Sequence, residues 1–424
     1  MIDIKLIRED PEKYAAAARA KKVPADIPAL LEADSLLLKA RQELQDVRTA
    51  QNAAGKQIAR LSGQAKAAAI AEMQGLKARA KELSERIAEL EPKFNELMLL
   101  AAQPAADDVP LGADETENVE LRRVGQVPQF DFEPLDHVQL GELLDIIDIP
   151  RGVKLAGARN YLLKGAGARL HQAVLRLAVD IMVARGYTLL TVPVLVNESV
   201  MYGTGYFPLG RDQAYLVERD GQCLVGTAEV PVTACHGEEV LDGAELPKKY
   251  VALSTCFRRE AGAAGKDAYG LYRIHYFDKV EQVIVAGNDE EASKGFHAEI
   301  VANAEAVLAA LELPYRVMNV CTGDLGQGQI QKFDLETWMP SRKAYGETHS
   351  ASRFGDFQAR RLNMRYRDAD GKIRFCHTLN NTVIASPRIL IPLLELNQQA
   401  DGSVTVPQAL RPYMGGMERI ARVR

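Results

Sequence analysis

The stretch from Cys256 to Glu281, CFRREAGAAGKDAYGLYRIHYFDKVE, decides the fold of the larger part of this chain. Two apolar, β-prone runs flank a loop rich in Gly and Ala, which predicts a strand–loop–strand hairpin. Arg258 and Glu260 are two residues apart, so on a strand they would share one face. A guanidinium suits phosphate and a neighbouring carboxylate can accept from a base, so the pair indicates a nucleotide site. An exposed cross-strand salt bridge is the alternative use of the same residues.

The composition of the chain is that of an ordinary globular protein with more than one core. Its 424 residues exceed the size of a typical single core, so we expect two domains. The net charge of −5 requires any nucleic-acid contact to come from a local patch. The five cysteines show no C-x-x-C spacing, which argues against a disulfide framework or zinc and favours a reducing cytoplasm. The charged first residues and the lack of a long apolar run predict neither a signal peptide nor a membrane span.

The first hundred residues carry two heptad seams, which predict an antiparallel pair of long helices over about 28–100. Five residues, 62–66, separate the seams and are too few for anything except a reversal of the chain. The first seam is Leu30, Ala33, Leu37, Ala40, Leu44, Val47, Gln51, Ala54, Ile58 and Leu61, and the second is Met73, Leu76, Ala80, Leu83, Ile87, Leu90, Phe94 and Leu97.

The tip of this predicted hairpin is basic. Residues 47–71 contain no acidic side chain and four basic ones, Arg48, Lys56, Arg60 and Lys66. A basic tip on an acidic chain is typical of a phosphate-backbone contact. A solvated helix surface or a coiled coil that dimerises would carry the same charges.

A stretch rich in Pro, Gly and Asp at 104–112 predicts a linker between a domain at 1–103 and a domain at 113–424. Beyond it, helical patterns alternate with short β-rich runs, as in a mixed domain of helices and sheet. No phosphate loop of the G-x-x-x-x-G-K-[S/T] type is present, and the glycines at 165–167 lack the frame of a dinucleotide loop. A nucleotide site in this domain must therefore be of another kind.

Four further segments accompany the opening stretch, and together they resemble the class II aminoacyl-tRNA synthetases, within them the seryl-tRNA synthetases. A helix and strand ending at Pro193 resemble motif 1, Phe257-Arg258-x-Glu260 resembles motif 2, and Arg388 ahead of an apolar helix resembles motif 3. The seryl-specific parts are the helical arm and the segments 226–229, 321–326 and 406–414, and the segments 346–350 and 378–382 accompany them. The resemblance implies an α+β fold: an antiparallel two-helix coiled-coil arm followed by a catalytic domain with an antiparallel β-sheet flanked by helices.

The resemblance implies a serine–tRNA ligase that forms seryl-adenylate from serine and ATP and transfers the seryl group to tRNA(Ser). Arg258, Arg388 and Glu347 would be the catalytic residues, with Arg258 at the α-phosphate and Arg388 at the far end of the triphosphate. Glu347 and Ser350 would hold Mg²⁺ with ATP, because hard oxygen ligands suit that ion. The implied ATP-binding set is Arg258, Arg259, Glu260, Ile274, His275, Tyr276, Phe277, Glu347, Thr348, His349, Ser350 and Arg388.

Serine recognition falls by resemblance to Thr227, Ala228, Glu229, Glu281 and Thr382. Buried polar partners distinguish serine from alanine, since alanine would leave them unpaired. The alternatives are a structural ion pair for Glu281 and a plain helix-start role for Thr382. His275 and His349 are expected to pack or shape the site rather than to act as bases or zinc ligands.

By resemblance the arm grips the long variable arm of tRNA(Ser), motif 1 builds a homodimer, and tRNA(Sec) is charged as in the family generally. Arg259 departs from the family, which commonly has serine there. Two rivals remain: a paralogue that loads a carrier protein, and an RNA-binding module without activity. The first would lack the full arm, and the second would be expected to lose Arg258, Glu260, Glu347 or Arg388.

Overall fold

The computed structural model describes residues 1–262 and 269–422, which form two compact units, Met1–Pro104 and Ala105–Arg424. Residues 263–268 of the predicted hairpin loop lie outside the described residues. Residues 105–112 belong to the second unit and are hydrogen-bonded to its later segments: Ala106 N donates to Ile330 O at 3.0 Å, and Pro110 O accepts from Thr322 N at 2.9 Å. The boundary predicted at 104–112 stays a prediction.

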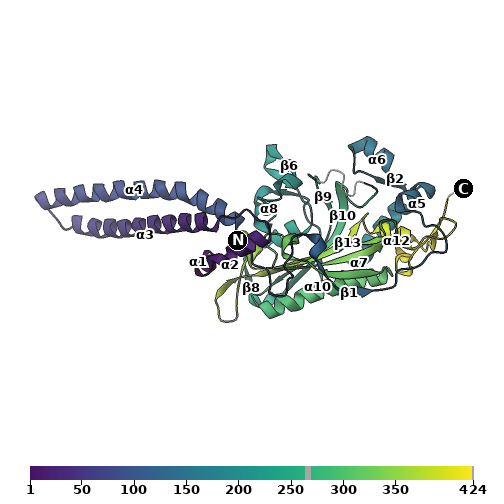
Figure 1. Cartoon of the computed structure of the whole chain (residues 1–424). Helices are drawn as coiled ribbons and strands as arrows, with labels where there is room; N and C mark the ends of the chain where they lie inside the picture. The colour runs from purple at the N-terminus through teal and green to yellow at the C-terminus, as the bar shows by residue number, and fades with distance from the viewer. Residues whose placement is uncertain (263–268, 423–424) are drawn as a thin grey trace. The chain divides into compact units, whose positions relative to one another are not determined.

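The first unit consists of four helices: α1 Ile4–Glu9, α2 Pro11–Ala20, α3 Ile27–Ile58 and α4 Gly63–Leu100. The start of α3 is fixed because the Asp26 side chain accepts from Ala29 N and Pro28 occupies the first turn. Helices α3 and α4 run side by side over their length (Figure 1), which confirms the predicted helical hairpin.

The predicted heptad positions form the contact between α3 and α4. Leu30, Leu37, Leu44 and Leu83 are buried, whereas the seam positions nearer the tip are half-buried except Leu61, which is exposed. Arg79 of α4 also pairs across the hairpin with Glu43 of α3 at 2.8 Å. No residue between 45 and 82 is buried, so packing weakens towards the tip.

The second unit is built on an eight-stranded sheet in the order β1-β11-β12-β13-β16-β10-β9-β4. All neighbours are antiparallel except β4 and β9, which are parallel. The strands are β1 Val119–Val124, β4 Thr188–Leu190, β9 Lys248–Phe257, β10 Tyr276–Ala286, β11 Tyr315–Asn319, β12 Gln331–Met339, β13 Ala344–Gly355 and β16 His377–Ser386.

Smaller elements surround this sheet. The helices are α5 His137–Leu143, α6 Ile149–Ala156, α7 Gly165–Ala184, α8 Glu198–Thr204, α9 Glu229–Ala234, α10 Glu290–Ala310, α11 Phe357–Leu362 and α12 Leu390–Leu396. The short strands are β2 Ile147–Asp148, β3 Leu162–Leu163, β5 Leu195–Asn197, β6 Tyr215–Val217, β7 Gln222–Leu224, β8 Val240–Asp242, β14 Arg365–Arg367, β15 Ile373–Phe375, β17 Val404–Thr405 and β18 Arg419–Ile420.

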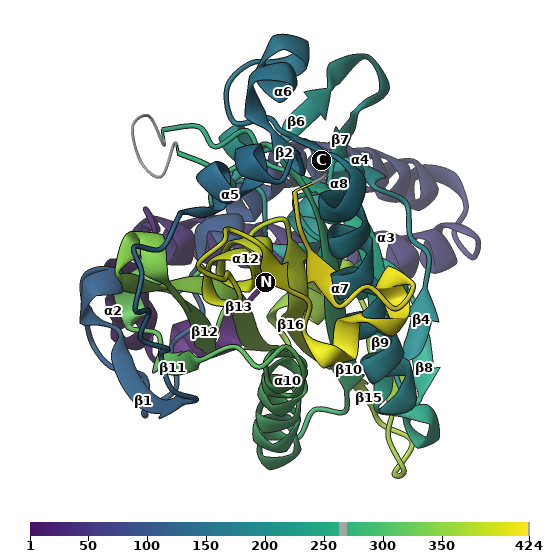
Figure 2. The same ribbon diagram turned by 90° about the vertical axis from the view of Figure 1, so that its right-hand side faces the viewer.

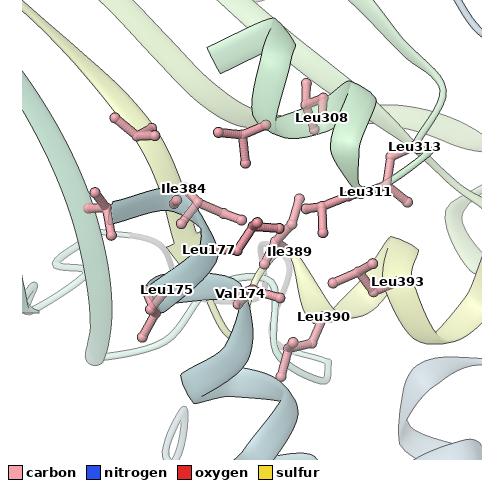
Figure 3. Packing of buried hydrophobic residues seen from close by; sticks show 14 of the residues in the cluster. Val174, Leu175, Leu177, Leu308, Leu311, Leu313, Ile384, Ile389, Leu390 and Leu393 are labelled. Atoms are coloured by element: carbon pink, nitrogen blue, oxygen red, sulfur yellow. The ribbon is translucent and has the colours of Figure 1, made fainter. Parts of the chain in front are cut away.

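The main core lies where α7 and α10 pack on β16 (Figure 2). Val174 of α7, Leu308 of α10, Ile384 of β16 and Leu393 of α12 are almost fully buried in it (Figure 3). Burying a side chain of this size contributes about 1.5–3 kcal/mol, so the two helices hold one face of the sheet firmly. Among the described helices, none combines the length and apolar character needed to cross a bilayer.

Candidate functional site

The two central strands, β10 and β16, turn alternate side chains to opposite faces of the sheet. Gln282 and Asn381 face α10: Gln282 Nε2 donates to Ile300 O at 2.9 Å and to Asn381 Oδ1 at 2.6 Å. Their neighbours Glu281 and Thr382 meet on the other face, where Thr382 Oγ1 donates to Glu281 Oε2 at 3.4 Å. The candidate site therefore lies on the face that α10 leaves open.

The hairpin predicted around Arg258 is confirmed, but its strands are shorter than predicted. Strand β9 ends at Phe257, so Arg258 and Glu260 lie in the loop, and Glu260 adopts a positive φ of 51°. The prediction that Arg258 and Glu260 share one face of a strand is therefore wrong. Both nevertheless line the same two adjoining cavities, because Arg258 N donates to His275 O at 2.9 Å and keeps the loop paired.

Two arginines predicted to hold phosphate face this cavity, each against an aromatic ring. The Arg258 guanidinium lies 5.2 Å from the ring centre of Phe277, and its Nε donates to Gly226 O at 3.4 Å. The Arg388 guanidinium lies 4.4 Å from the ring centre of Tyr272, and its Nη1 donates to Glu347 O at 2.9 Å. Both positive charges are fixed in place before any anion binds.

Glu260 also faces a cation within the cavity. Arg273 Nη1 donates to Glu260 Oε2 at 3.0 Å, and both side chains line the wall. Ile274 and Phe277 add apolar surface beside them. Together these side chains make a flat, partly apolar recess with one carboxylate at its edge.

A bulge in β13 places Glu347 and Ser350 on one face. Glu347 pairs with Glu336 and His349 pairs with Leu335, so Thr348 is the extra residue. In a regular strand, residues three apart point to opposite faces. The extra residue in the bulge brings Glu347 and Ser350 back to the same face. Ser350 donates to Asp334 across the strand pair, which leaves a hydroxyl lone pair and the Glu347 carboxylate on the open face.

The electrostatic surroundings keep Glu347 ionised. Its side chain is exposed to the cavity, yet many protein atoms surround it, and this burial alone would raise the pKa. Arg388, Lys332, Arg258 and Lys279 outweigh that effect and hold the pKa of Glu347 below its ordinary value. Burial also lowers the pKa of His349 to about 4, so this histidine is neutral.

Glu229 is buried at the start of α9 and is held by two neutral donors. Tyr206 Oη donates to its Oε2 at 2.7 Å and Gln358 Nε2 donates to its Oε1 at 2.8 Å. Thr227 Oγ1 accepts from Glu229 N at 3.2 Å, and Ala228 between them is fully buried. Burial, followed by repulsion from Glu281, raises the pKa of Glu229 to about 7.

Glu281 is also buried, but it is paired with a cation. Lys279 Nζ lies 2.6 Å from Glu281 Oε2, and both side chains are less than a tenth exposed. Lys279 and Thr382 also line the cavity of Arg258 and Arg388. The acidic pair Glu229 and Glu281 thus adjoins the cationic cavity, which gives the site one acidic end and one basic end.

Five predicted ATP residues lie outside the lining of these cavities, and His349 and Ser350 of β13 are two of them. Arg259 is exposed and its Nη1 donates to Asp212 O at 3.4 Å. His275 Nδ1 lies 3.0 Å from Arg258 O, where it supports the loop. Tyr276 stacks on Tyr161 with ring centres 4.9 Å apart. Their roles in ATP binding stay predictions.

Sequence reasoning missed several side chains that shape the site. Lys279 had a signal, because it precedes Glu281 by two residues in one strand and so shares its face. Tyr206 and Gln358 reach Glu229 from segments 23 and 129 residues away, and no local pattern indicates such a contact. One alternative is wrong, because Thr382 lies inside β16 rather than at a helix start. The alternative of a structural ion pair for Glu281 stays open, since Glu281 is paired with Lys279.

The four basic residues predicted for the arm are all exposed on the hairpin tip. Arg48 and Lys56 lie on α3, Arg60 follows it, and Lys66 lies in the first turn of α4. The ion pairs found among the described residues of the arm do not include any of these four side chains. The tip therefore presents positive charge to solvent.

Comparison with known families gives two matches that together span most of the chain. The family model described as seryl-tRNA synthetase N-terminal domain matches residues 1–100. The model described as tRNA synthetase class II core domain (G, H, P, S and T) matches residues 215–397. The second range contains all the predicted site residues outside the arm.

Individual proteins are similar over the full length. The chain is 45% identical to a serine–tRNA ligase of Deinococcus radiodurans, over 99% of this chain and 98% of that protein. It is 42% identical to a serine–tRNA ligase of Symbiobacterium thermophilum over the whole of both. A crystal structure of seryl-tRNA synthetase from Pyrococcus horikoshii complexed with ATP superimposes with a TM-score of 0.93, at 35% identity and 100% coverage of both chains.

Proposed function

We propose a role for each part of the site from one premise: the chain belongs to the seryl-tRNA synthetase family. Its function is that of a serine–tRNA ligase. Serine and ATP give seryl-adenylate and diphosphate, and the seryl group then passes to the 3′ end of tRNA(Ser). The observation that carries this function is the site's division into a cationic cavity and an adjoining pair of buried carboxylates, Glu229 and Glu281.

The cationic cavity binds the triphosphate of ATP. Arg258 contacts the α-phosphate and Arg388 the far end of the chain. Negative charge grows on the phosphates as the serine carboxylate attacks, and fixed cations stabilise it without reorganising. The rigid contacts of Arg258 with Phe277 and of Arg388 with Tyr272 support this role.

The recess beside these arginines binds adenine. Glu260 accepts from the adenine amino group, and Phe277 and Ile274 pack on the base. The cavity lining supports these three roles. Arg259, His275, Tyr276, Thr348 and His349 complete the proposed ATP set by supporting the loop and strand around it.

Mg²⁺ fits the oxygen donors of β13. Glu347 is ionised and Ser350 has a free lone pair on the same face, and such hard oxygens suit this ion. These two residues would hold Mg²⁺ together with phosphate oxygens, since Mg²⁺ on nucleotides usually needs only one or two protein ligands. Bound Mg²⁺ supplies further neutralisation of phosphate charge.

The region around the two buried carboxylates binds serine. Glu281 and Glu229 attract the ammonium and hydroxyl groups, Thr227 and Thr382 add hydroxyl partners, and Ala228 keeps the wall small. The mutual contacts of these side chains support this set. Alanine has no hydroxyl and would forgo the charge-assisted hydrogen bond that serine makes here, which is worth roughly 1.5–3 kcal/mol.

The arm binds tRNA through phosphate contacts of Arg48, Lys56, Arg60 and Lys66. Their exposure at the tip supports this role. The arm recognises the shape of the long variable arm of the tRNA and does not read the anticodon. For this reason tRNA(Sec) can be a second substrate.

The active form is a homodimer in the cytoplasm. Edge strand β4 and the neighbouring β9 expose Leu189 at 46% and Leu253 at 40%, and an apolar groove adjoins them. An uncovered apolar sheet edge is the kind of surface that a second subunit covers. The five free cysteines support a reducing compartment.

The first experiment is serine-dependent ATP–diphosphate exchange, with alanine, threonine and cysteine in parallel, followed by charging of total tRNA. We expect exchange with serine and charging of tRNA(Ser). The Arg258→Lys variant should lose exchange about 100-fold, because a lysine cannot keep the planar contact with Phe277. Exchange without charging would indicate the carrier-loading activity instead, and absence of exchange would contradict the proposal.

A further inference from the structure

The loop that carries Tyr272 and Arg273 is anchored to the start of helix α5. Asp136 caps this helix with a reciprocal capping box, and Tyr269 Oη donates to Asp136 Oδ2 at 3.0 Å. Leu271 N donates to Nε2 of His137 at 3.2 Å, deep in the interior. The described end of the loop, residues 269–273, is therefore held by two neighbouring residues of one helix.

The two partners of His137 define its tautomer. Nε2 accepts from the Leu271 backbone N–H, which can only donate, so Nε2 carries no proton. Nδ1 lies 2.7 Å from Glu395 Oε1, so Nδ1 carries the proton and donates it to the carboxylate. His137 thus works as a neutral connector between the loop and Glu395 of α12.

Glu395 is fully buried and collects several donors. His137 N donates to it at 3.0 Å, Ser341 N at 2.9 Å and Ser341 Oγ at 2.7 Å. A buried carboxylate is tolerated only when hydrogen bonds satisfy it, and here they come from α5 and from the turn at Pro340–Arg342. One side chain therefore joins three segments that are far apart in the sequence.

The anchored residues lie next to the groups that face the phosphate end. Leu271 precedes Tyr272, whose ring centre lies 4.4 Å from the Arg388 guanidinium and 4.1 Å from that of Arg342. Tyr272 O also accepts from Arg388 Nε at 3.1 Å. Ser341 precedes Arg342. The hydrogen bonds that converge on Glu395 therefore hold the residues just before Tyr272 and Arg342, which stack on each other.

We propose that His137 is a positioning residue for ATP binding: as a neutral imidazole it links Leu271 to Glu395 and thereby sets the Tyr272–Arg388 stack. The inference rests on the proposed function, since it assigns ATP phosphate to Arg388. It is independent of any contact between His137 and a substrate, because His137 is buried and does not line either cavity.

The fit around His137 is tight enough for this role. Gly270 has a φ of +68°, and a Cβ there would lie 2.0 Å from His137 Nε2. Any residue other than glycine at position 270 would displace the imidazole. The loop backbone therefore packs directly against the imidazole ring.

Two isosteric variants separate the halves of the link. In His137→Asn the amide nitrogen replaces Nδ1 and keeps Glu395, but the acceptor for Leu271 is lost. In His137→Gln the amide oxygen replaces Nε2 and keeps Leu271. We expect the Kd for ATP, measured by titration calorimetry, to rise about tenfold in His137→Asn and about threefold in His137→Gln, in which Glu395 loses the ring donor but keeps the His137 backbone N–H. The KM for serine should stay unchanged in both.

The matched control is His377→Asn, which alters a buried histidine paired with Ser293 and absent from the cavity lining. It should leave the Kd for ATP unchanged. A milder variant, Tyr269→Phe, removes only the exposed contact with Asp136 and should raise the Kd for ATP about threefold. It decides the question if His137→Asn does not fold.

Equal ATP affinity in wild type, His137→Asn and Tyr269→Phe would overturn the inference, as would a parallel loss of serine and ATP affinity. Missing serine-dependent exchange in the wild type would count against the proposed function instead. The comparison of ATP affinities would decide this inference even then.

Discussion

Glu229 illustrates how a single buried carboxylate couples pH to function. Burial, and then Glu281, raises its pKa from an ordinary value near 4.5 to about 7. Serine binding needs the ionised form, so we expect kcat/KM for serine to rise as pH increases through about 7. Measuring kcat/KM for serine between pH 5.5 and 8.5 tests this, and Glu229→Gln should abolish the rise along with most activity.

The same shift affects stability with a defined sign. The folded state binds more protons than the unfolded state between about pH 4.5 and pH 7, so this group lowers the free energy of unfolding as pH rises through that window. Glu229→Gln should reduce that slope in urea titrations. An unchanged slope and a flat kcat/KM profile would both contradict the raised pKa.

Single residues could be predicted where the chemistry is local to a motif. Arg258, Glu347 and Arg388 stand in short patterns, and the structure places each of them at one cavity. Gln358 and His137 could not be predicted, because their partners lie 129 and 258 residues away. Their roles depend on how the sheet brings distant segments together.

Elements differ in how strongly the sequence specifies them. The helices α3 and α4 follow from an unbroken heptad pattern, whose period directly reflects their contact. The bulge at Thr348 has no such period, so the common face of Glu347 and Ser350 could not be derived. Likewise the strand pattern around Arg258 did not indicate that β9 would end at Phe257.

The hairpin tip yields a prediction at this scale. Changing Arg48, Lys56, Arg60 and Lys66 to Gln should raise the KM for tRNA and flatten its salt dependence by roughly three to four units of log–log slope. Serine-dependent exchange should not change, since the arm and the catalytic unit are separate compact units. Aminoacylation at several salt concentrations measures the slope.

A matched control uses four exposed cations further from the tip: Lys39, Lys77, Arg86 and Lys93. Their change to Gln removes the same net charge from the same two helices. If both quadruple variants flatten the salt dependence equally, the tip has no special role in binding tRNA.

At the scale of the whole molecule, the exposed edge of the sheet predicts assembly. Leu189→Glu on β4 should convert the proposed homodimer into monomers, because it puts a charge into the apolar contact surface. Light scattering coupled to size-exclusion chromatography measures the mass directly. The exposed Ile373 on β15 supplies the control, since Ile373→Glu should leave the mass unchanged. Equal masses for wild type and Leu189→Glu would contradict this interface.

The absence of buried residues between 45 and 82 has a consequence for the stability of the outer end of the arm. The seam residues of its outer turns are only half-buried, so opening these turns exposes less apolar surface than opening the turns near Leu37 and requires less free energy. Local opening should therefore make amide hydrogen exchange faster there than near Leu37. If tRNA binds the tip as proposed, we expect it to slow amide hydrogen exchange in those turns, because part of the binding energy would then stabilise the outer end of the two helices.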